Sequence, residues 1–145
     1  MATRNGSVRL REAIDCILNQ TYRDLELIIS DNVSDDATQK ICEDYAKKDR
    51  RVRYIRQKRD IGSFANCSFT LQESRGEFFM RADDDDFRDS CVLEKAVEML
   101  NADPEIVMAF GNARFLYPET GGMTDLVPTE YFPFERERYA RLKRY

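Results

Sequence analysis

The chain of 145 residues contains no histidine and no tryptophan. Without histidine it lacks the commonest general base near neutral pH and the commonest ligand of transition metals. Any chemistry must therefore use carboxylates, hydroxyls, thiols or a bound ion. The sequence also lacks a run of the ~18 apolar residues that a membrane-spanning helix needs, and it shows no signal peptide.

Cysteine is sparse, and its spacing excludes a zinc knuckle, because no Cys-x-x-Cys pair occurs. Cys16, Cys42 and Cys67 have apolar neighbours, as small core residues do, and Cys91 stands at the start of a predicted helix. Cysteines used in this way favour a reducing, cytoplasmic location.

The charge balance is mildly acidic, with a net charge of −4. This disfavours general nucleic-acid binding. Hydrophobic residues make up 42% and charged residues 34%, which describes a soluble globular protein. Residues 135–145 place five basic side chains among aromatic ones. A solvated helix is the favoured interpretation, while peripheral membrane association of a full enzyme through acidic headgroups stays open.

The stretch from Gly76 to Phe87 carries the clearest chemical signal. A short aromatic strand is expected over residues 77–82, and four consecutive carboxylates follow it, Asp83 to Asp86. Four adjacent like charges oppose folding unless a cation offsets them, and Mg²⁺ takes such oxygen ligands together with phosphate oxygens. The alternative is a solvated acidic loop that caps the next helix. The run predicts a metal-assisted phosphate site at the end of a strand.

Hydrophobic periodicity predicts alternating helices and strands. Helices are expected to start near residue 8, after residues 34–36, at residue 63 and after residues 89–90. Strands are expected over residues 25–30, 52–56, 77–82 and 106–110, the last continued through 113–117, with a turn at 118–122. This order indicates an α/β fold, a mainly parallel sheet with helices on both faces. The loops at Asp31 and Asp83 then share one edge of the sheet.

The front of the chain leaves only residues 1–3 before the first helix. A sheet of this kind normally begins with a strand, so we expect the first strand to be missing and the chain to be cut at both ends. An unpaired sheet edge recruits other chains, which makes a homodimer plausible.

The ordered motifs over residues 2–111 resemble those of family 2 glycosyltransferases. The residues that carry the resemblance are Thr3-Arg4-Asn5-Gly6, Leu10, Ala13-Ile14, Ile17-Leu18, Gln20-Thr21-Tyr22, Leu25-Glu26-Leu27-Ile28-Ile29, Asp31, Ser34, Asp36, Thr38, Val52-Arg53-Tyr54-Ile55, Gly62, Asn66, Gly76-Glu77 and the D-x-D-D run Asp83-Asp84-Asp85-Asp86. The resemblance implies a GT-A fold, in which a Rossmann-like nucleotide-binding half joins an acceptor half. Residues 1–117 would be the nucleotide-sugar domain and residues 118–145 the start of the acceptor side.

The implied activity is inverting, metal-assisted transfer of a hexose-type sugar from a nucleotide diphosphate, with a uridine diphosphate sugar expected first. The acceptor would be a glycan, lipid or polysaccharide, and the cofactor Mg²⁺ or Mn²⁺. The resemblance implies these site residues: Thr3, Arg4, Asp31, Arg59, Gly62, Asn66 and Asp84 for the nucleotide, with Asp31 on the base and Asp84 toward the ribose, and Asp83 and Asp85 for the metal.

Several of these residues have simpler interpretations. Asp31 could be a helix-capping loop residue, Gly62 a turn that needs a permissive backbone, Asn66 an exposed helix position and Arg59 a solvated loop charge. For the whole chain, the alternative is a non-catalytic metal- or partner-binding module that keeps the fold.

The sequence departs from the family pattern in several places. Arg4 replaces a usual Tyr, Asn32 a second Asp, and Asp60 an Asn that commonly precedes the glycine. Inverting members take their general base from a later part of the chain, and Glu130, Glu135 and Glu137 match no motif. No catalytic residue is therefore assigned.

Overall fold

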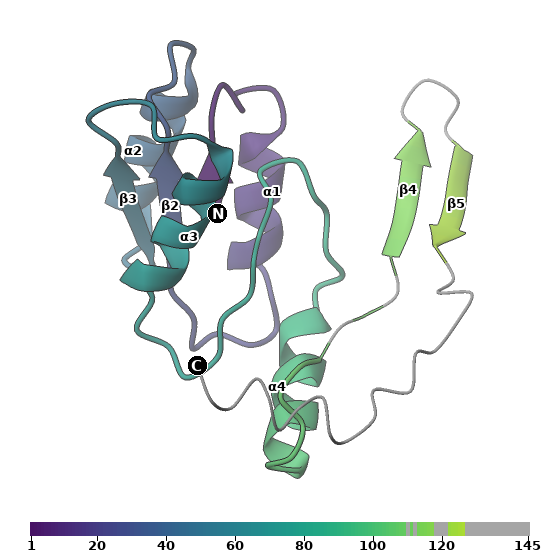
Figure 1. Ribbon diagram of the computed structural model, residues 1–145. Coiled ribbons are helices and arrows are strands. Elements are labelled where there is room, and N and C mark those ends of the chain that lie inside the picture. Colours follow the sequence, from purple (N-terminus) through teal and green to yellow (C-terminus); the bar gives the residue numbers. More distant parts are fainter. Residues whose placement is uncertain (110, 112, 118–121, 127–145) are drawn as a thin grey trace. The chain divides into compact units, whose positions relative to one another are not determined.

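The computed structural model describes residues 1–109, 111, 113–117 and 122–126. Two compact units divide the chain, Met1–Ala109 and Phe110–Tyr145. The first unit contains three strands and four helices, which alternate as far as α3, and α4 follows α3 without a strand between them (Figure 1). Its elements are β1 (Ala2–Thr3), α1 (Leu10–Leu18), β2 (Leu27–Asp31), α2 (Thr38–Lys48), β3 (Val52–Arg56), α3 (Ser63–Glu73) and α4 (Val92–Ala102).

The sheet of the first unit is parallel, with the order β1-β2-β3. Its register places Thr3 opposite Asp31, and Asp31 opposite Arg56. The carboxyl ends of all three strands therefore meet at one edge, where an α/β sheet binds its ligands.

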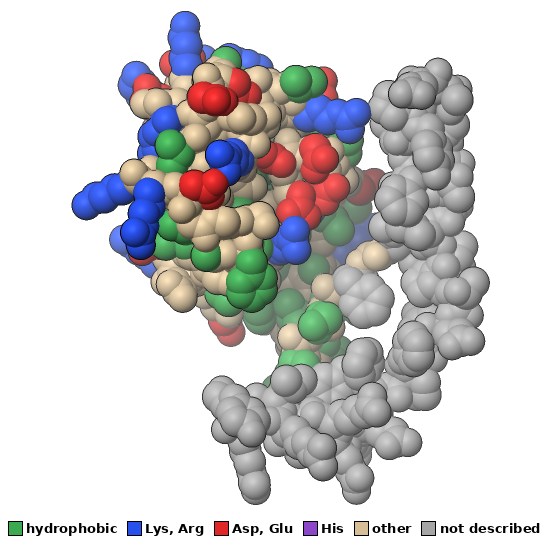
Figure 2. Space-filling model, turned by 45° about the horizontal axis from the view of Figure 1, so that its top comes forward, with side chains coloured by type: hydrophobic (Ala, Val, Ile, Leu, Met, Phe, Trp, Pro, Cys, Tyr) green, Lys and Arg blue, Asp and Glu red, His purple; other side chains and the backbone are tan. Residues whose placement is uncertain are grey.

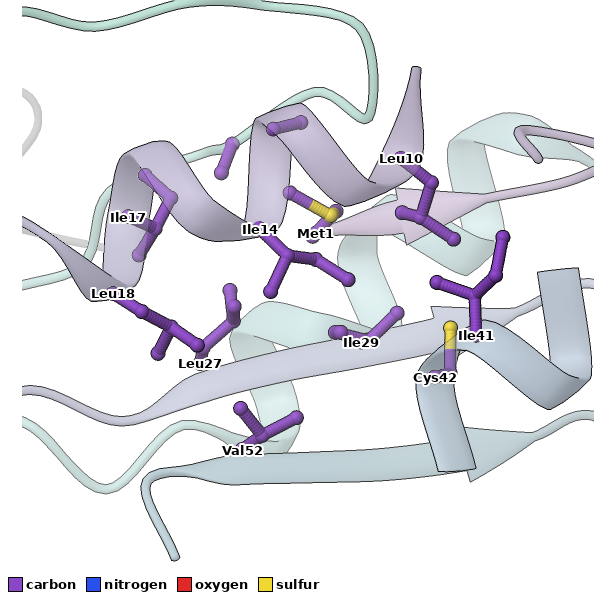
Figure 3. Close-up of a cluster of buried hydrophobic side chains, with 12 residues drawn as sticks. Met1, Leu10, Ile14, Ile17, Leu18, Leu27, Ile29, Ile41, Cys42 and Val52 are labelled. Carbon is purple, nitrogen blue, oxygen red and sulfur yellow. The ribbon is translucent and has the colours of Figure 1, made fainter. Parts of the chain in front are cut away.

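Helices cover both faces of this sheet, as predicted. Alternate residues of a strand point to opposite faces, and Leu27 and Ile29 belong to the apolar core that α1 and α2 form with the sheet (Figure 3). On the other face Ser30 contacts Asn66 of α3. The stripe of α1 that periodicity predicted is buried in this core: Leu10, Ile14, Ile17 and Leu18.

The expected absence of a first strand is wrong. Residues 2 and 3 form β1, and its backbone pairs with β2: the Ser30 amide donates to the Met1 carbonyl at 2.9 Å, and the Asn32 amide donates to the Thr3 carbonyl at 2.9 Å. Two residues give no hydrophobic periodicity, so no sequence pattern could reveal this strand.

The strand expected over residues 77–82 is also wrong. These residues are not in a strand, and of them only Ala82 joins the core. Phe78 and Phe79 remain 38% and 43% exposed. A strand here needs a neighbour with free backbone groups along its length, and the two residues of β1 offer too few.

The strand expected over residues 106–110 does not form at residues 106–109, and Phe110 lies outside the described residues. Instead the Ile106 amide donates to the Asp103 carbonyl at 3.0 Å and closes a turn. Exposure of Met108 to 69% shows that this segment lacks the packing that stabilises a strand.

The predicted continuation into a strand is confirmed in the second unit as β4 (Ala113–Tyr117). It pairs antiparallel with β5 (Gly122–Leu126), a strand that the sequence pattern did not reveal. The described residues leave out most of the predicted turn between these two strands. They also leave out Glu130, Glu135, Glu137 and the basic segment 135–145. Among the helices that are described, none combines the length and apolar character that crossing a membrane requires.

Candidate functional site

The acidic run contacts the carboxyl end of β1. The Thr3 hydroxyl donates a hydrogen bond to the Asp84 carboxylate, which joins residues 81 positions apart. Gly6 passes close to this pair, and a Cβ there would lie 2.7 Å from the Thr3 hydroxyl oxygen and closer still to Asp84. Glycine at position 6 therefore leaves the space in which Asp84 sits.

An open pocket of about 240 Å³ lies between the β1–α1 loop and the acidic run. Two carboxylates, Asp84 and Asp85, share its wall with two guanidinium side chains, Arg4 and Arg9. Figure 2 shows acidic side chains gathered on one face, with Lys and Arg side chains on the same face. Burial raises the pKa of Asp84 above its ordinary value, and the negative charges of Asp85 and Asp83 raise it further, while the Thr3 hydrogen bond opposes the rise.

The other carboxylates of the run are paired with neighbouring arginines. Arg81 donates to Asp83 from Nε at 3.0 Å and from Nη2 at 2.9 Å, and Arg88 donates to Asp86 at 3.4 Å. In the described part of the chain, no group of three or more acidic or thiol side chains has an arrangement that could hold a metal. The structure thus brings Asp84 and Asp85 to the pocket together, and Asp83 is held by Arg81.

Asp31 is completely buried at the end of β2. Its carboxylate accepts hydrogen bonds from the Ser34 amide at 2.8 Å, the Tyr54 hydroxyl at 2.8 Å and Arg56 at 3.1 Å. Burial raises the pKa of Tyr54, and so does the hydrogen bond to Asp31. Asp31 therefore ties its own loop to β3, and its contact with a base stays a prediction.

Asp60 connects three segments at the same edge. Its carboxylate accepts hydrogen bonds from the Asn32 amide nitrogen at 2.7 Å, the Gly62 backbone at 2.9 Å and the Arg4 guanidinium. Asn32 in turn accepts from the Ile61 backbone at 2.9 Å. The Gly62 amide is the main cause of the lowered pKa of Asp60.

This cluster was missed from the sequence as a unit. Arg4, Asn32 and Asp60 were three separate departures from the family pattern, and the structure shows that they contact one another. No pattern along the sequence joins these three positions, because they lie in loops after three different strands.

The remaining predicted nucleotide residues lie on or next to the β3–α3 connection. Gly62 has φ +83°, so the turn does need a glycine-like backbone. Asn66 is not an exposed helix position: it is buried, donates to the Ser30 carbonyl at 2.9 Å and accepts from the Ser30 hydroxyl at 2.6 Å. Arg59 is exposed on the loop. Nucleotide contacts by these three residues stay predictions.

A parallel α/β sheet with a charged pocket at the carboxyl ends of its strands has its pocket where open α/β folds bind their ligands. The family model "Glycosyl transferase family 2" matches residues 1–144. The chain belongs to this family, and it has the GT-A fold that the resemblance implied.

The curated relatives include an uncharacterized glycosyltransferase of Methanocaldococcus jannaschii, 28% identical over 96% of this chain and 49% of its own length. A second is the GalNAc(5)-diNAcBac-PP-undecaprenol beta-1,3-glucosyltransferase of Campylobacter jejuni, 36% identical over 68% of this chain and 32% of its own length. The chain thus spans about half of the first relative and about a third of the second.

Two solved structures share the fold. The mannosyltransferase PcManGT of Pyrobaculum calidifontis, in complex with GDP-Man and Mn²⁺, has a TM-score of 0.65 and 26% identity over 72% of this chain and 32% of its own. TarS of S. aureus (residues 1–349) has a TM-score of 0.64 and 22% identity over 70% of this chain and 31% of its own.

Proposed function

We propose that this chain supplies the donor-binding part of a metal-assisted, inverting glycosyltransferase. The donor is a nucleotide diphosphate sugar, with a uridine diphosphate sugar expected first, and the acceptor is a glycan or lipid. One observation carries the proposal: Asp84 and Asp85 line the same strand-end pocket as Arg4 and Arg9. A site with both signs of charge suits a divalent cation together with a diphosphate.

The relatives support this choice of ligands. TarS has been solved in complex with UDP and with UDP-GlcNAc, and PcManGT with GDP-Man and Mn²⁺. The Campylobacter jejuni relative is named as a glucosyltransferase on a diphosphate-linked undecaprenol. These names favour a hexose donor and make a lipid-linked acceptor one of the two classes to test.

The carboxylates of the pocket fit a hard cation. Mg²⁺ is commonly held by one or two carboxylates and completed by water and substrate phosphates, so Asp84 and Asp85 are a sufficient protein share. The mutual repulsion that helps to raise the pKa of Asp84 is relieved when a cation lies between them. A bound divalent ion would neutralise the charge that develops on the departing diphosphate.

The other side chains of the site position the carboxylates and bind the phosphate oxygens. Thr3 fixes one oxygen of Asp84, and Gly6 leaves room for that contact. Arg4 and Arg9 line the same pocket, where phosphate oxygens can accept from Arg9 and from the N–H groups of Arg4 that Asp60 leaves free. Arg81 occupies one oxygen of Asp83, and Asp83 does not line the pocket, so we assign it a lesser role than Asp85.

Titration calorimetry with uridine diphosphate, in Mn²⁺ and in EDTA, tests the proposal. We expect binding that requires the metal and that Asp85→Asn weakens by about tenfold or more, the loss of one charge-assisted contact. Asp86→Asn is the matched control, because it removes a neighbouring carboxylate that does not line the pocket. Binding that is equal in EDTA, or equally weakened by both variants, contradicts a metal-assisted site at Asp85.

A further inference from the structure

A second hollow, of about 620 Å³, lies at the amino ends of β2 and β3, the sheet edge opposite the acidic run. Three separate segments supply its walls: residues 23–26 just before β2, residues 49–51 and Arg53 before and within β3, and Arg75 after α3. Five arginines line it, together with only three carboxylates. The proposed glycosyltransferase chemistry makes no use of this hollow.

Two of these arginines are brought together by one backbone oxygen. Arg23 Nη1 and Arg51 Nη2 each donate to the Leu18 carbonyl at 3.1 Å. Guanidinium groups that share an acceptor are close neighbours, and their like charges repel unless negative charge is nearby. Asp49 supplies that charge for Arg51 alone, through a hydrogen bond of 2.7 Å to the same Nη2. The Arg51 hydrogen bonds lower the pKa of Asp49 to about 2.

Of the two other carboxylates that line the hollow, Glu26 is paired, whereas Asp24 forms no ion pair among the described residues. Glu26 accepts from Arg53 at 3.1 Å through one oxygen, and from the Arg75 backbone amide at 2.6 Å through the other. Arg53 is also paired with Glu73 at 3.1 Å. In the part of the chain that the structure describes, Arg23, Arg50 and Arg75 form no ion pair.

We infer that this arginine-lined hollow is an anion-binding site for a phosphate group. The planar guanidinium fork matches phosphate oxygens and binds them with two parallel hydrogen bonds, so several unpaired forks around one hollow select for this group. Lys47 and Lys48, exposed at the end of α2 next to Asp49, extend the positive surface. The phosphate comes either from a free phosphate species or from a phospholipid headgroup, and the chemistry is the same for both.

The first arm of the test uses inorganic phosphate and the full chain in EDTA, which removes the metal on which the other site depends. We expect saturable binding that weakens as salt rises and that Arg23→Gln with Arg50→Gln reduces by about tenfold or more. Arg11→Gln with Lys40→Gln is the matched control, because it removes two exposed charges outside the hollow. Arg50→Gln alone keeps the test valid if the double variant unfolds, since Arg50 makes no ion pair.

The second arm uses sedimentation with phosphatidylglycerol vesicles and with phosphatidylcholine vesicles. Binding to the anionic vesicles that the arginine variants lose, and the control retains, assigns the site to headgroups. Phosphate binding without vesicle binding assigns it to a free phosphate species. If neither probe binds, or if the arginine and control variants lose binding equally, the inference is overturned. Uridine diphosphate binding should be unaffected in the arginine variants, which keeps this outcome separate from that of the donor site.

Discussion

At the scale of single residues, Asp31 shows how one side chain joins separate loops. Its carboxylate is inaccessible to solvent and accepts three hydrogen bonds, from Ser34, Tyr54 and Arg56. Asp31→Asn replaces an acceptor oxygen with a donor and leaves at least one buried partner unsatisfied. We expect it to lower the free energy of unfolding by about 1–3 kcal/mol. Urea unfolding, followed by circular dichroism, measures this loss.

Tyr54→Phe serves as the companion change, because it removes one donor and leaves the carboxylate in place. It should lower the free energy of unfolding by less than Asp31→Asn does. If Asp31→Asn left the unfolding midpoint unchanged and weakened only nucleotide binding, the structural role would be wrong and the base contact favoured.

The contact between Asn32 and Asp60 suggests that the amide and the carboxylate have exchanged positions relative to the family pattern. The family pattern has Asp near the first position and Asn near the second, and here the amide of Asn32 donates to the carboxylate of Asp60 at 2.7 Å. Asn32→Asp alone brings two carboxylates together, and Asp60→Asn alone removes the partner of Arg4. Both single changes should therefore lower the thermal midpoint.

The double variant Asn32→Asp with Asp60→Asn should recover most of that loss, because one carboxylate and one amide again face each other. Differential scanning fluorimetry of the natural chain, the two single variants and the double variant measures how far the two changes in thermal midpoint depend on each other. Losses that simply add would show that the two positions are independent.

At the scale of elements, the start of α2 depends on Asp36. The carboxylate accepts from the Thr38 amide at 2.9 Å and from the Ser7 amide at 3.1 Å, so it joins the helix to the β1–α1 loop. Burial opposes ionisation, but the hydrogen bonds from Thr38 and Ser7 together outweigh it and lower the pKa of Asp36 below its ordinary value. Because the folded state holds the charged form, Asp36 stabilises the fold above the unfolded pKa of about 3.9, and this contribution is lost as pH falls toward the folded value.

We expect Asp36→Asn to be less stable than the natural chain at neutral pH, with the difference shrinking as pH falls below about 4. Asp35→Asn is the control, because only its backbone amide forms a hydrogen bond here. Thermal unfolding between about pH 7 and pH 2 measures both variants. A difference that grows in acid would reverse the assigned sign.

Sequence periodicity predicted the long elements well. The apolar stripes of α1 and the run at β2 were visible because each element buries one face or both faces in the core. The pattern failed where backbone pairing with a neighbouring strand decides whether a strand forms. Residues 77–82 have side chains typical of a strand but no adequate strand to pair with. Conversely, β1 pairs with a neighbouring strand but has only two residues. The β4–β5 hairpin was half predicted, because β5 begins with Gly and carries Thr and Asp between its apolar residues.

At the scale of the whole molecule, the sequence predicted which edge of the sheet the acidic run reaches, but not its side-chain contacts. The prediction placed the Asp83–Asp86 run at the edge of Asp31 through a parallel strand at residues 77–82 that does not form, yet Asp84 does lie against the end of β1. Which carboxylate faces the pocket depends on the contact of Thr3 with Asp84 and on the pairing of Asp83 with Arg81. Side-chain choices of this kind depend on neighbours far away in the sequence, so a linear pattern cannot rank the four carboxylates.

Because the chain divides into two compact units, we expect the first unit to fold without the second. Every member of the buried core cluster lies between Met1 and Ala82, and the residues that line both hollows lie between Arg4 and Asp85. A protein of residues 1–109 should therefore fold cooperatively and retain metal-dependent binding of uridine diphosphate within about threefold of the full chain, a difference of less than 1 kcal/mol. Urea unfolding and calorimetry of both proteins measure this. Loss of cooperative unfolding in the shorter protein would mean that residues 110–145 complete its core, and loss of binding alone would mean that they contribute to the donor site.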